Sequence, residues 1–309
     1  MICWLNGEFL ERSAAHLSAS DRGFLLGDGL FETLRFEAGT LRRWARHEAR
    51  LKAGLEALGI MADLPADMPS LAAELASRNA LDAAIIRLTV SRGAGARGLD
   101  TAVGGDAAGA STVLVQAGPL PAPVSPRLVL IPAPRRAPLT LAAHFKMIGY
   151  GDSIHVRRAA RASGADMGVM LSPTGHIACA DSANVFWVTG RTVYTPSLDT
   201  GALNGTTRAA ILDECARRDL HIEAGSFRTE SLSSAEAVIV TNAVIGARPA
   251  AGHDGKAHTT DALGEFSCRL IVRMVLLEAG TAEEGDAGPH EVQLAEAVQE
   301  LAGDVYHTQ

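Results

Sequence analysis

Residues 178–188 read Ala178-Cys179-Ala180-Asp181-Ser182-Ala183-Asn184-Val185-Phe186-Trp187-Val188, with apolar residues on both sides of the polar pair Asp181-Ser182. The apolar runs predict strands at 176–179 and 184–189. The same reasoning predicts other elements around them: strands at 127–132, 167–172, 191–195 and 236–241, and helices at 206–218 and 263–279. Short strands are therefore expected to dominate the second half of the chain.

The first half of the chain predicts a smaller α+β domain. An Asn6-Gly7 turn predicts a hairpin between residues 2 and 10, and residues 21–28 are predicted to form a loop. Further elements are expected after it: strands at 30–36, 84–90 and 111–116, and helices at 44–60 and around 69–80. The proline-rich segment 118–126 predicts a stiff linker.

Together these patterns predict an α+β (mixed α/β) protein with two domains. A small N-terminal domain is expected over 1–118, a linker over 119–126, a larger strand-rich domain over 127–280, and an acidic helical extension over 281–309. A length of 309 residues suits two domains.

Composition excludes several classes of protein. A net charge of −7 argues against non-specific binding to nucleic acid or to an anionic membrane. No apolar run approaches the roughly 20 residues of a membrane helix. The N-terminus lacks the pattern of a secretory signal, and the four cysteines have no CxxC spacing. These features predict a cytoplasmic protein with reduced thiols.

Lys146 is one of three lysines, and its surroundings differ from those of the other two. It lies in the apolar, glycine-flanked segment Ala143-His144-Phe145-Lys146-Met147-Ile148-Gly149-Tyr150-Gly151. Burying a lysine charge is costly unless it is paired or neutralised, and a covalent bond to a carbonyl neutralises it usefully. The alternative is a lysine that reaches solvent from a half-buried strand end, and the segment alone favours neither.

A glycine-rich segment, Arg92-Gly93-Ala94-Gly95-Ala96-Arg97-Gly98, follows the strand at 84–90. It is not a dinucleotide fingerprint, because it runs into further loop instead of opening a helix. We predict a loop that presents Arg92 and Arg97, whose guanidinium groups suit a substrate carboxylate. A purely structural loop is the alternative.

Two further segments suit a phosphate group. Gly205-Thr206-Thr207 precedes the helix at 206–218 and offers backbone amides, hydroxyls and the positive end of the helix dipole, although simple capping by Thr206 is the alternative. Thr241-Asn242-Ala243, at the end of the strand at 236–241, is the second candidate for phosphate contacts. Arg50 is a candidate for the balancing charge, and a place on a solvated helix face is the alternative. The histidines in 176–179 and 253–258 lack the ligand set of a zinc site, so no metal is expected.

The ordered set of segments resembles the fold-type IV pyridoxal-phosphate enzymes over roughly residues 2–250. The matching pieces are Gly27-Asp28-Gly29-Leu30-Phe31-Glu32, His47-Glu48-Ala49-Arg50-Leu51, Lys146, residues 178–188, Val193-Tyr194-Thr195-Pro196 and Leu203-Asn204-Gly205-Thr206-Thr207-Arg208. This family includes branched-chain and D-amino-acid aminotransferases and aminodeoxychorismate lyase. Residues 91–98, 183–187 and 203–205 look most like the lyase. The resemblance implies that the larger domain is a pseudobarrel that binds the cofactor.

The resemblance also implies roles for individual residues. Lys146 would form the internal aldimine with pyridoxal 5'-phosphate and then act as acid and base. The residues implied for cofactor binding are Arg50, Cys179, Asn184, Thr206, Thr207, Asn242 and Ala243. The residues implied for substrate binding are Phe31, Arg97 and Tyr150. Family members usually form homodimers, so a homodimer is expected.

The chain departs from the family pattern at Cys179. Relatives carry a glutamate at this position, where it pairs with the protonated pyridine nitrogen and strengthens the ring as an electron sink. A neutral thiol does not do so. Asp181 is a possible substitute, because it lies two residues further along a strand, although that is about 6–7 Å away.

Three functional hypotheses follow. The first is a lyase of the aminodeoxychorismate type, which releases pyruvate and 4-aminobenzoate. The second is a D-amino-acid or branched-chain type aminotransferase with an altered ring-nitrogen environment. The third is a homologue whose cofactor chemistry is weakened or lost. A weaker electron sink should impair transamination more than elimination, which favours the lyase.

Overall fold

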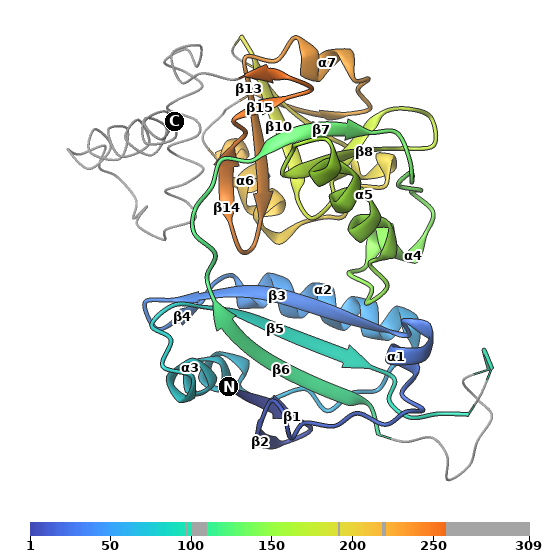
Figure 1. Cartoon of the computed structure of the whole chain (residues 1–309), viewed down its shortest axis with the longest axis vertical. Helices are drawn as coiled ribbons and strands as arrows, with labels where there is room; N and C mark the ends of the chain where they lie inside the picture. The colour runs from blue at the N-terminus through green and yellow to red at the C-terminus, as the bar shows by residue number, and fades with distance from the viewer. Residues whose placement is uncertain (97, 101–109, 191, 218–220, 258–309) are drawn as a thin grey trace. The chain divides into compact units, whose positions relative to one another are not determined.

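The structure is a computed structural model that describes residues 1–96, 98–100, 110–190, 192–217 and 221–257. The chain folds into two compact units (Figure 1). The first holds Met1–Ala122 with His144–Tyr150, and the second holds Pro123–Ala143 and the described residues from Gly151 onward. Residues 144–150, which the predicted ranges place in the second domain, pack with the first unit. The predicted helix at 263–279 and the extension at 281–309 lie outside the described residues.

The first unit is built on a six-stranded antiparallel sheet with the strand order β2-β1-β6-β5-β3-β4. Its strands are β1 (Ile2–Leu5), β2 (Glu8–Glu11), β3 (Gly29–Glu37), β4 (Thr40–Leu41), β5 (Ala84–Ser91) and β6 (Thr112–Pro119). Helices α2 (Trp44–Leu58) and α3 (Met68–Arg78) pack against one face, where Leu30, Leu34 and Phe36 of β3 join the core (Figure 1). Because side chains alternate along a strand, Phe31 points to the opposite face.

The predicted loop at 21–28 contains a short helix, α1 (Arg22–Leu26), so the prediction is wrong there. The carboxylate of Asp21 caps the helix by accepting hydrogen bonds from the backbone N–H of Phe24 and the hydroxyl of Ser91. The helix exposes three consecutive apolar side chains, those of residues 24–26. No helical periodicity therefore marks it in the sequence.

The second unit contains two five-stranded sheets. The first has the order β12-β11-β10-β13-β14, with β10 (Asn184–Thr189), β11 (Thr192–Pro196), β12 (Ile222–Gly225), β13 (Ala237–Asn242) and β14 (Gly246–Pro249). The other has the order β16-β15-β7-β8-β9, with β7 (Arg127–Ile131), β8 (Met167–Leu171), β9 (Ile177–Ala180), β15 (Gly252–His253) and β16 (Lys256–Ala257). Both predicted strands of segment 176–189 are confirmed.

Strand β10 is buried on both faces, which explains its continuous apolar sequence. Val185 and Trp187 pack with Val169 of β8 in one core cluster, so the two sheets share a core. Phe186 packs in a second core cluster, which also contains Ile211 of helix α6 (Thr206–Arg217).

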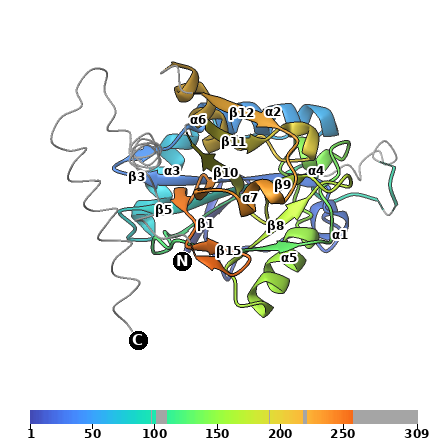
Figure 2. The same ribbon diagram turned by 90° about the horizontal axis from the view of Figure 1, so that it is seen from above.

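The main element missed by the sequence prediction is helix α5 (Gly151–Ala162), which packs along β7 and β8 (Figure 1). Figure 2 shows α5 beside β8 from a second direction. It buries only Ser153, Val156 and Ala160, so its apolar stripe is narrow and made of small residues. The remaining short elements are α4 (Leu141–His144), η2 (Leu198–Thr200) and α7 (Glu230–Ser233). Among the described residues, no helix combines the length and the apolar character needed to cross a membrane.

Candidate active site

The backbone around Lys146 is fixed to strand β3. The N–H of Phe31 donates to the carbonyl of Lys146 at 2.9 Å, and the N–H of Ile148 donates to the carbonyl of Gly29 at 3.0 Å. A glycine is required at residue 29, because an added Cβ would lie 2.6 Å from Cδ1 of Ile148 and 2.4 Å from the carbonyl oxygen of Val90. Segment 146–148 therefore has a defined position on the sheet of the first unit.

The side chain of Lys146 lies beside two aromatic rings. Its Nζ donates to the hydroxyl of Tyr150 at 3.0 Å, and it lies 4.4 Å from the ring centroid of Phe31 and 5.1 Å from that of Tyr150. The two rings meet edge to face at 5.2 Å. Lys146 forms no ion pair with any carboxylate in the described parts of the chain. The structure thus brings together three of the predicted site residues.

Arg87 of β5 completes this group, and the sequence analysis did not identify it. Its guanidinium carbon lies 3.7 Å from the ring centroid of Phe31, and its Nε donates to the hydroxyl of Thr89 at 3.3 Å. Burial lowers the pKa of Arg87, and the nearby Tyr150 opposes that change. In the sequence, Arg87 differs in no way from an outward-facing residue of an alternating strand. We call Lys146, Tyr150, Phe31 and Arg87 the cation cluster.

Arg50 lies in the first unit and is paired with Glu32. Its Nε and Nη2 donate to the Glu32 carboxylate at 2.8 and 2.7 Å, and the Nδ1 of His47 lies 2.7 Å from the same carboxylate. Burial would raise the pKa of Glu32, but the hydrogen bonds from His47 and Arg50 outweigh it and hold the pKa below its usual range. Burial lowers the pKa of His47, so its neutral imidazole donates to the carboxylate.

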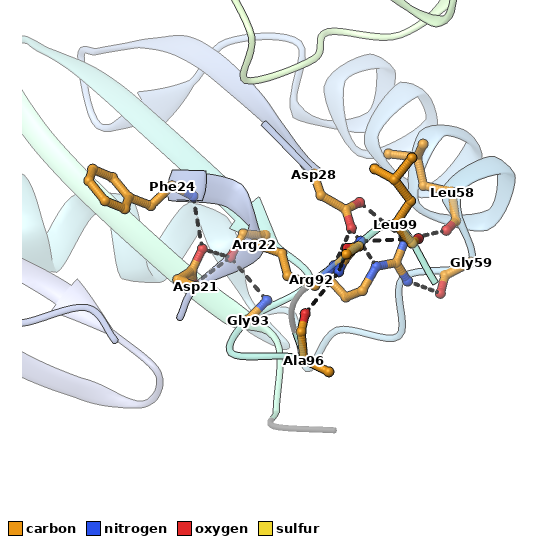
Figure 3. Close-up of polar contacts among 12 residues, drawn as sticks. Asp21, Arg22, Phe24, Asp28, Leu58, Gly59, Arg92, Gly93, Ala96 and Leu99 are labelled. Atoms are coloured by element: carbon orange, nitrogen blue, oxygen red, sulfur yellow. Dashed lines mark hydrogen bonds and ion pairs between the residues drawn. The ribbon is translucent and has the colours of Figure 1, made fainter. Parts of the chain in front are cut away.

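Arg92 has a structural role, in contrast to its predicted place at a substrate carboxylate (Figure 3). Its Nε donates to Asp28 at 2.7 Å, and its other nitrogens donate to the carbonyls of Leu58 and Gly59. Arg22 donates to the same Asp28 carboxylate at 2.9 Å and also to the carbonyl of Gly98 in the loop after β5. All three nitrogens of the Arg92 guanidinium thus donate hydrogen bonds within the first unit. Arg97 lies outside the described residues.

In the second unit, the start of helix α6 has the features of an anion site. The hydroxyls of Thr207, in its first turn, and of Thr241, at the end of β13, are buried and have no hydrogen-bond partner among the described residues. A Cβ at Gly205 would collide with the side-chain oxygen of Asn184, so only glycine fits before the helix. Thr206 is buried at the first position of the helix. Thr241 belongs to the segment 241–243 that the sequence predicts for phosphate contacts.

Two predicted cofactor residues use their side chains to hold the backbone. The amide of Asn184 donates to the carbonyl of Leu203 at 2.9 Å, which fixes the segment that leads into α6. The side-chain oxygen of Asn242 accepts from the N–H groups of Val244 and Ile245, and its nitrogen donates to the carbonyl of Ser182. Asn242 thereby shapes the turn that contains Ala243. Both side chains therefore hold backbone segments, Asn184 before α6 and Asn242 after β13.

Cys179 lies in strand β9 of the second unit, in an apolar cluster with Met170 and Ala202. Burial raises the pKa of its thiol, Arg136 opposes this rise and Asp181 adds to it. The thiol is therefore protonated at neutral pH.

Asp181 is engaged elsewhere in the second unit. Its carboxylate accepts from Nε and Nη2 of Arg157 at 2.8 and 2.5 Å, and from the backbone N–H of Gly168 at 2.9 Å. With only 1% of this side chain exposed, the ion pair holds the carboxylate in place. This engagement argues against Asp181 as the substitute for a carboxylate at position 179. Within the described residues, no three His, Cys, Asp or Glu side chains gather as a metal site would require.

Comparison with known proteins relates this chain to one family. The model of the family "Amino-transferase class IV" matches residues 29–252. The chain is 30% identical to aminodeoxychorismate lyase of Bacillus subtilis over 250 residues, which covers 78% of this chain and 83% of the relative. It is 25% identical to D-alanine aminotransferase of Bacillus licheniformis, covering 85% of this chain and 92% of the relative.

The fold is also found in a solved structure. Branched-chain amino acid aminotransferase from Escherichia coli superposes with a TM-score of 0.80 at 23% identity, covering 93% of this chain and 97% of that one. The family match spans most of the chain and includes Phe31, Arg50, Lys146 and the start of α6. The chain belongs to the class IV aminotransferase family of enzymes.

Proposed function

We propose that this enzyme uses pyridoxal 5'-phosphate, that Lys146 bonds the cofactor covalently, and that it is a lyase of the aminodeoxychorismate type. The observation that carries the proposal is the position of the Lys146 amine, 3.0 Å from the Tyr150 hydroxyl and beside the Phe31 ring, with no carboxylate partner among the described residues. An amine without a carboxylate partner is more easily made neutral, as attack on a carbonyl requires.

The second unit supports the cofactor assignment independently. When bound, pyridoxal phosphate supplies an aldehyde, a phosphate anion and a ring that withdraws electrons from a substrate carbon. The buried hydroxyls of Thr207 and Thr241, which have no hydrogen-bond partner in the described parts of the chain, suit phosphate oxygens, as does the N-terminus of the 12-residue helix α6. We propose that Thr206, Thr207, Asn242 and Ala243 bind the phosphate, the latter two through backbone N–H groups. Arg50, held by Glu32, is the candidate for a balancing charge.

The environment of Cys179 favours elimination over transamination. A buried, protonated thiol offers no negative charge to the ring nitrogen, and Asp181 is paired with Arg157. Cys179 therefore leaves the ring a weaker electron sink. Transamination requires the ring to hold charge for longer than an elimination, in which a leaving group departs promptly. This difference supports a lyase reaction for the present chain.

The proposed reaction breaks the C–O bond that joins the enolpyruvyl group to the ring of 4-amino-4-deoxychorismate. The ring loses a proton and becomes 4-aminobenzoate, while the enolpyruvyl carbon gains a proton and leaves as pyruvate, so atoms and electrons balance. Lys146 and Tyr150 supply the groups that move protons. Arg87, which forms no ion pair with a described carboxylate, is the candidate anchor for a substrate carboxylate, and Arg97 remains a second candidate.

A D-amino-acid or branched-chain type aminotransferase is the second candidate. It is supported by similarity to D-alanine aminotransferase along nearly the same length of chain as the lyase. The third candidate, a homologue with weakened or lost cofactor chemistry, rests on Cys179 alone.

An absorption spectrum separates the third candidate from the other two. We expect the full-length protein with added pyridoxal phosphate to show an absorption band at about 420 nm, which borohydride fixes onto Lys146 and which Lys146→Ala lacks. Absence of this band at saturating cofactor would refute the cofactor assignment.

Product assays then separate lyase from aminotransferase. We expect 4-amino-4-deoxychorismate to give equimolar 4-aminobenzoate and pyruvate, and we expect little turnover of D-alanine, L-leucine or L-glutamate with 2-oxoglutarate. Brisk transamination without release of 4-aminobenzoate would refute the lyase and support the second candidate. Arg87→Gln should raise the KM of the active substrate more than it lowers kcat, because it removes a binding charge.

We further propose that the enzyme is a cytoplasmic homodimer. The described cysteines, Cys3, Cys179 and Cys215, form no disulfide, which suits a reducing compartment. The exposed apolar side chains of Phe24, Leu25 and Leu26 on α1 are candidates for a subunit contact. Light scattering coupled to size exclusion would test this, and a monomer at micromolar concentration would refute it.

A further inference from the structure

We propose that Tyr150 and Lys146 share protons as one acid–base pair, in which the Tyr150 oxygen receives the proton that the Lys146 amine must release before it attacks a carbonyl. This inference deepens the proposed function and rests on it only for the identity of that carbonyl. The pair is defined by the 3.0 Å distance between Nζ and the tyrosine oxygen.

The backbone and the rings together fix the geometry of the pair. Segment 146–148 is hydrogen-bonded to β3 at Gly29 and Phe31, so the Lys146 side chain starts from a fixed point. The aromatic rings of Phe31 and Tyr150 meet edge to face, and this contact holds the tyrosine ring in place. The amine has one hydrogen-bonding side chain beside it in the described structure, and this is the Tyr150 hydroxyl.

The charged side chains around the pair come from strands β3 and β5. Arg87 of β5 stacks on Phe31 and places a second cation in the cluster. Further along the same face of β3, the carboxylate of Glu37 is paired with Arg35. On the other face of β3, Glu32 is paired with Arg50 and His47 and points away from Phe31.

The chemistry of a lysine amine and a phenol suits a shared proton. In water the two groups hold their protons with nearly equal affinity, so one proton passes between them at little cost. When the pair has lost one proton to solvent, it is either an ammonium beside a phenolate or a neutral amine beside a phenol. In the second form the shared proton is on the tyrosine oxygen, and Nζ has a free lone pair. As the C–N bond to an aldehyde forms and the C–O bond breaks, both amine protons leave with the oxygen as water, and no other reactant is needed.

The three lysines of the chain make this pair measurable. Full-length protein stripped of cofactor and labelled with 13C-lysine should give three sets of Cε signals, of which Lys146→Ala removes one. In the wild type we expect the Lys146 signal to titrate in two coupled steps. In Tyr150→Phe, which keeps the ring and removes only the hydroxyl, we expect a single step. Tyr194→Phe is the matched control, because Tyr194 stacks on Trp187 in the second unit.

The rate at which pyridoxal 5'-phosphate bonds to the same proteins provides a second readout. We expect Tyr150→Phe to lower this rate by about tenfold or more at pH 7 to 8, and Tyr194→Phe to leave it within about twofold of the wild type. Identical Lys146 titrations in wild type and Tyr150→Phe would overturn the proposal, whatever the rates. Coupled titration with an unchanged rate would also overturn it, since the tyrosine would then receive no required proton.

The titration distinguishes this inference from the proposed function. It uses neither substrate nor turnover, and circular dichroism checks that each variant is folded. A protein that shows the coupled pair and converts no 4-amino-4-deoxychorismate would refute the proposed reaction and retain the pair. A protein that releases 4-aminobenzoate and shows uncoupled titration would do the reverse.

Discussion

Glu32 accepts hydrogen bonds from both Nε and Nη2 of Arg50, and 1% of its side chain is exposed. With 13% of its own side chain exposed, Arg50 depends on this carboxylate for its charge balance. Removing one partner of a buried pair leaves the other charge uncompensated, which costs far more than the pair itself contributes.

We therefore expect Glu32→Gln to lower the free energy of unfolding by about 3 kcal/mol. Glu37→Gln is the matched control, because Glu37 pairs with Arg35 on the same strand but has 34% of its side chain exposed. That change should cost less than about 1 kcal/mol. Urea unfolding of both variants measures the difference. Equal losses would show that burial does not increase the contribution of the Glu32–Arg50 pair to the free energy of unfolding.

The same group predicts a loss of stability at acid pH. Burial lowers the pKa of His47, and the hydrogen bonds to Glu32 lower the pKa of that carboxyl against the effect of its burial. Both pKa values are lower in the folded protein, so the unfolded chain binds more protons. The free energy of unfolding therefore decreases as the pH decreases. The His47 contribution is lost as pH falls below the ordinary value of 6.5, and the Glu32 contribution below 4.5.

Unfolding experiments at a series of pH values test this assignment. His47→Asn should flatten the dependence between 6.5 and 4.5, because the titrating imidazole is gone. The control is His155→Asn in helix α5, where the histidine side chain is exposed. A wild-type protein whose stability increases as pH drops through this window would contradict the assignment.

Cys179→Glu should restore a carboxylate in place of the thiol. We expect it to increase the rate of the amino-acid half-reaction of transamination by about tenfold or more, because a negative charge strengthens the ring as an electron sink. Arg136 lowers the cost of that charge, as its effect on the thiol indicates. Cys179→Ser is the neutral control and should leave the rate unchanged. If glutamate and serine behave alike in stopped-flow absorption, position 179 does not face the ring nitrogen.

Much of the fold was predictable because the spacing of apolar residues along the sequence is clear. The hairpin β1–β2, strand β3 and strand β10 have alternating or continuous apolar residues, and each appears within a residue or two of its predicted range. Helix α1 was missed because its apolar residues are consecutive and exposed, and α5 because it buries only small side chains. Local pattern carries no information about either.

The candidate site was predictable only where a residue type is unusual for its position. Lys146 stood out as a lysine in an apolar segment, and the resemblance placed Phe31 and Tyr150 near it. Arg87 was not identified, because an arginine on an outward strand position is ordinary. Its importance depends on register, which places Arg87 beside Thr33 on the face that bears Phe31.

The buried threonines give a test in which stability and binding should change in opposite directions. Thr207 and Thr241 each bury a hydroxyl that has no partner among the described residues, whereas the buried hydroxyl of Thr195 donates to the carbonyl of Val185 at 2.9 Å. Valine keeps the shape of threonine and removes the hydroxyl. An unpartnered buried hydroxyl destabilises the folded state, so Thr207→Val and Thr241→Val should leave the free energy of unfolding unchanged or higher. Thr195→Val should lower it by about 1 kcal/mol.

Cofactor affinity should follow the opposite order. If the two unpartnered hydroxyls serve a phosphate, each of their valine variants should weaken binding of pyridoxal phosphate by about tenfold, because hydrogen bonds to a charged group contribute about 1.5–3 kcal/mol. Thr195→Val should bind the cofactor as the wild type does. Titration of cofactor absorbance and urea unfolding on the same samples give both quantities. Unchanged affinity in Thr207→Val and Thr241→Val would mean that the start of α6 does not hold the phosphate, since no other property of these hydroxyls in the described structure requires them.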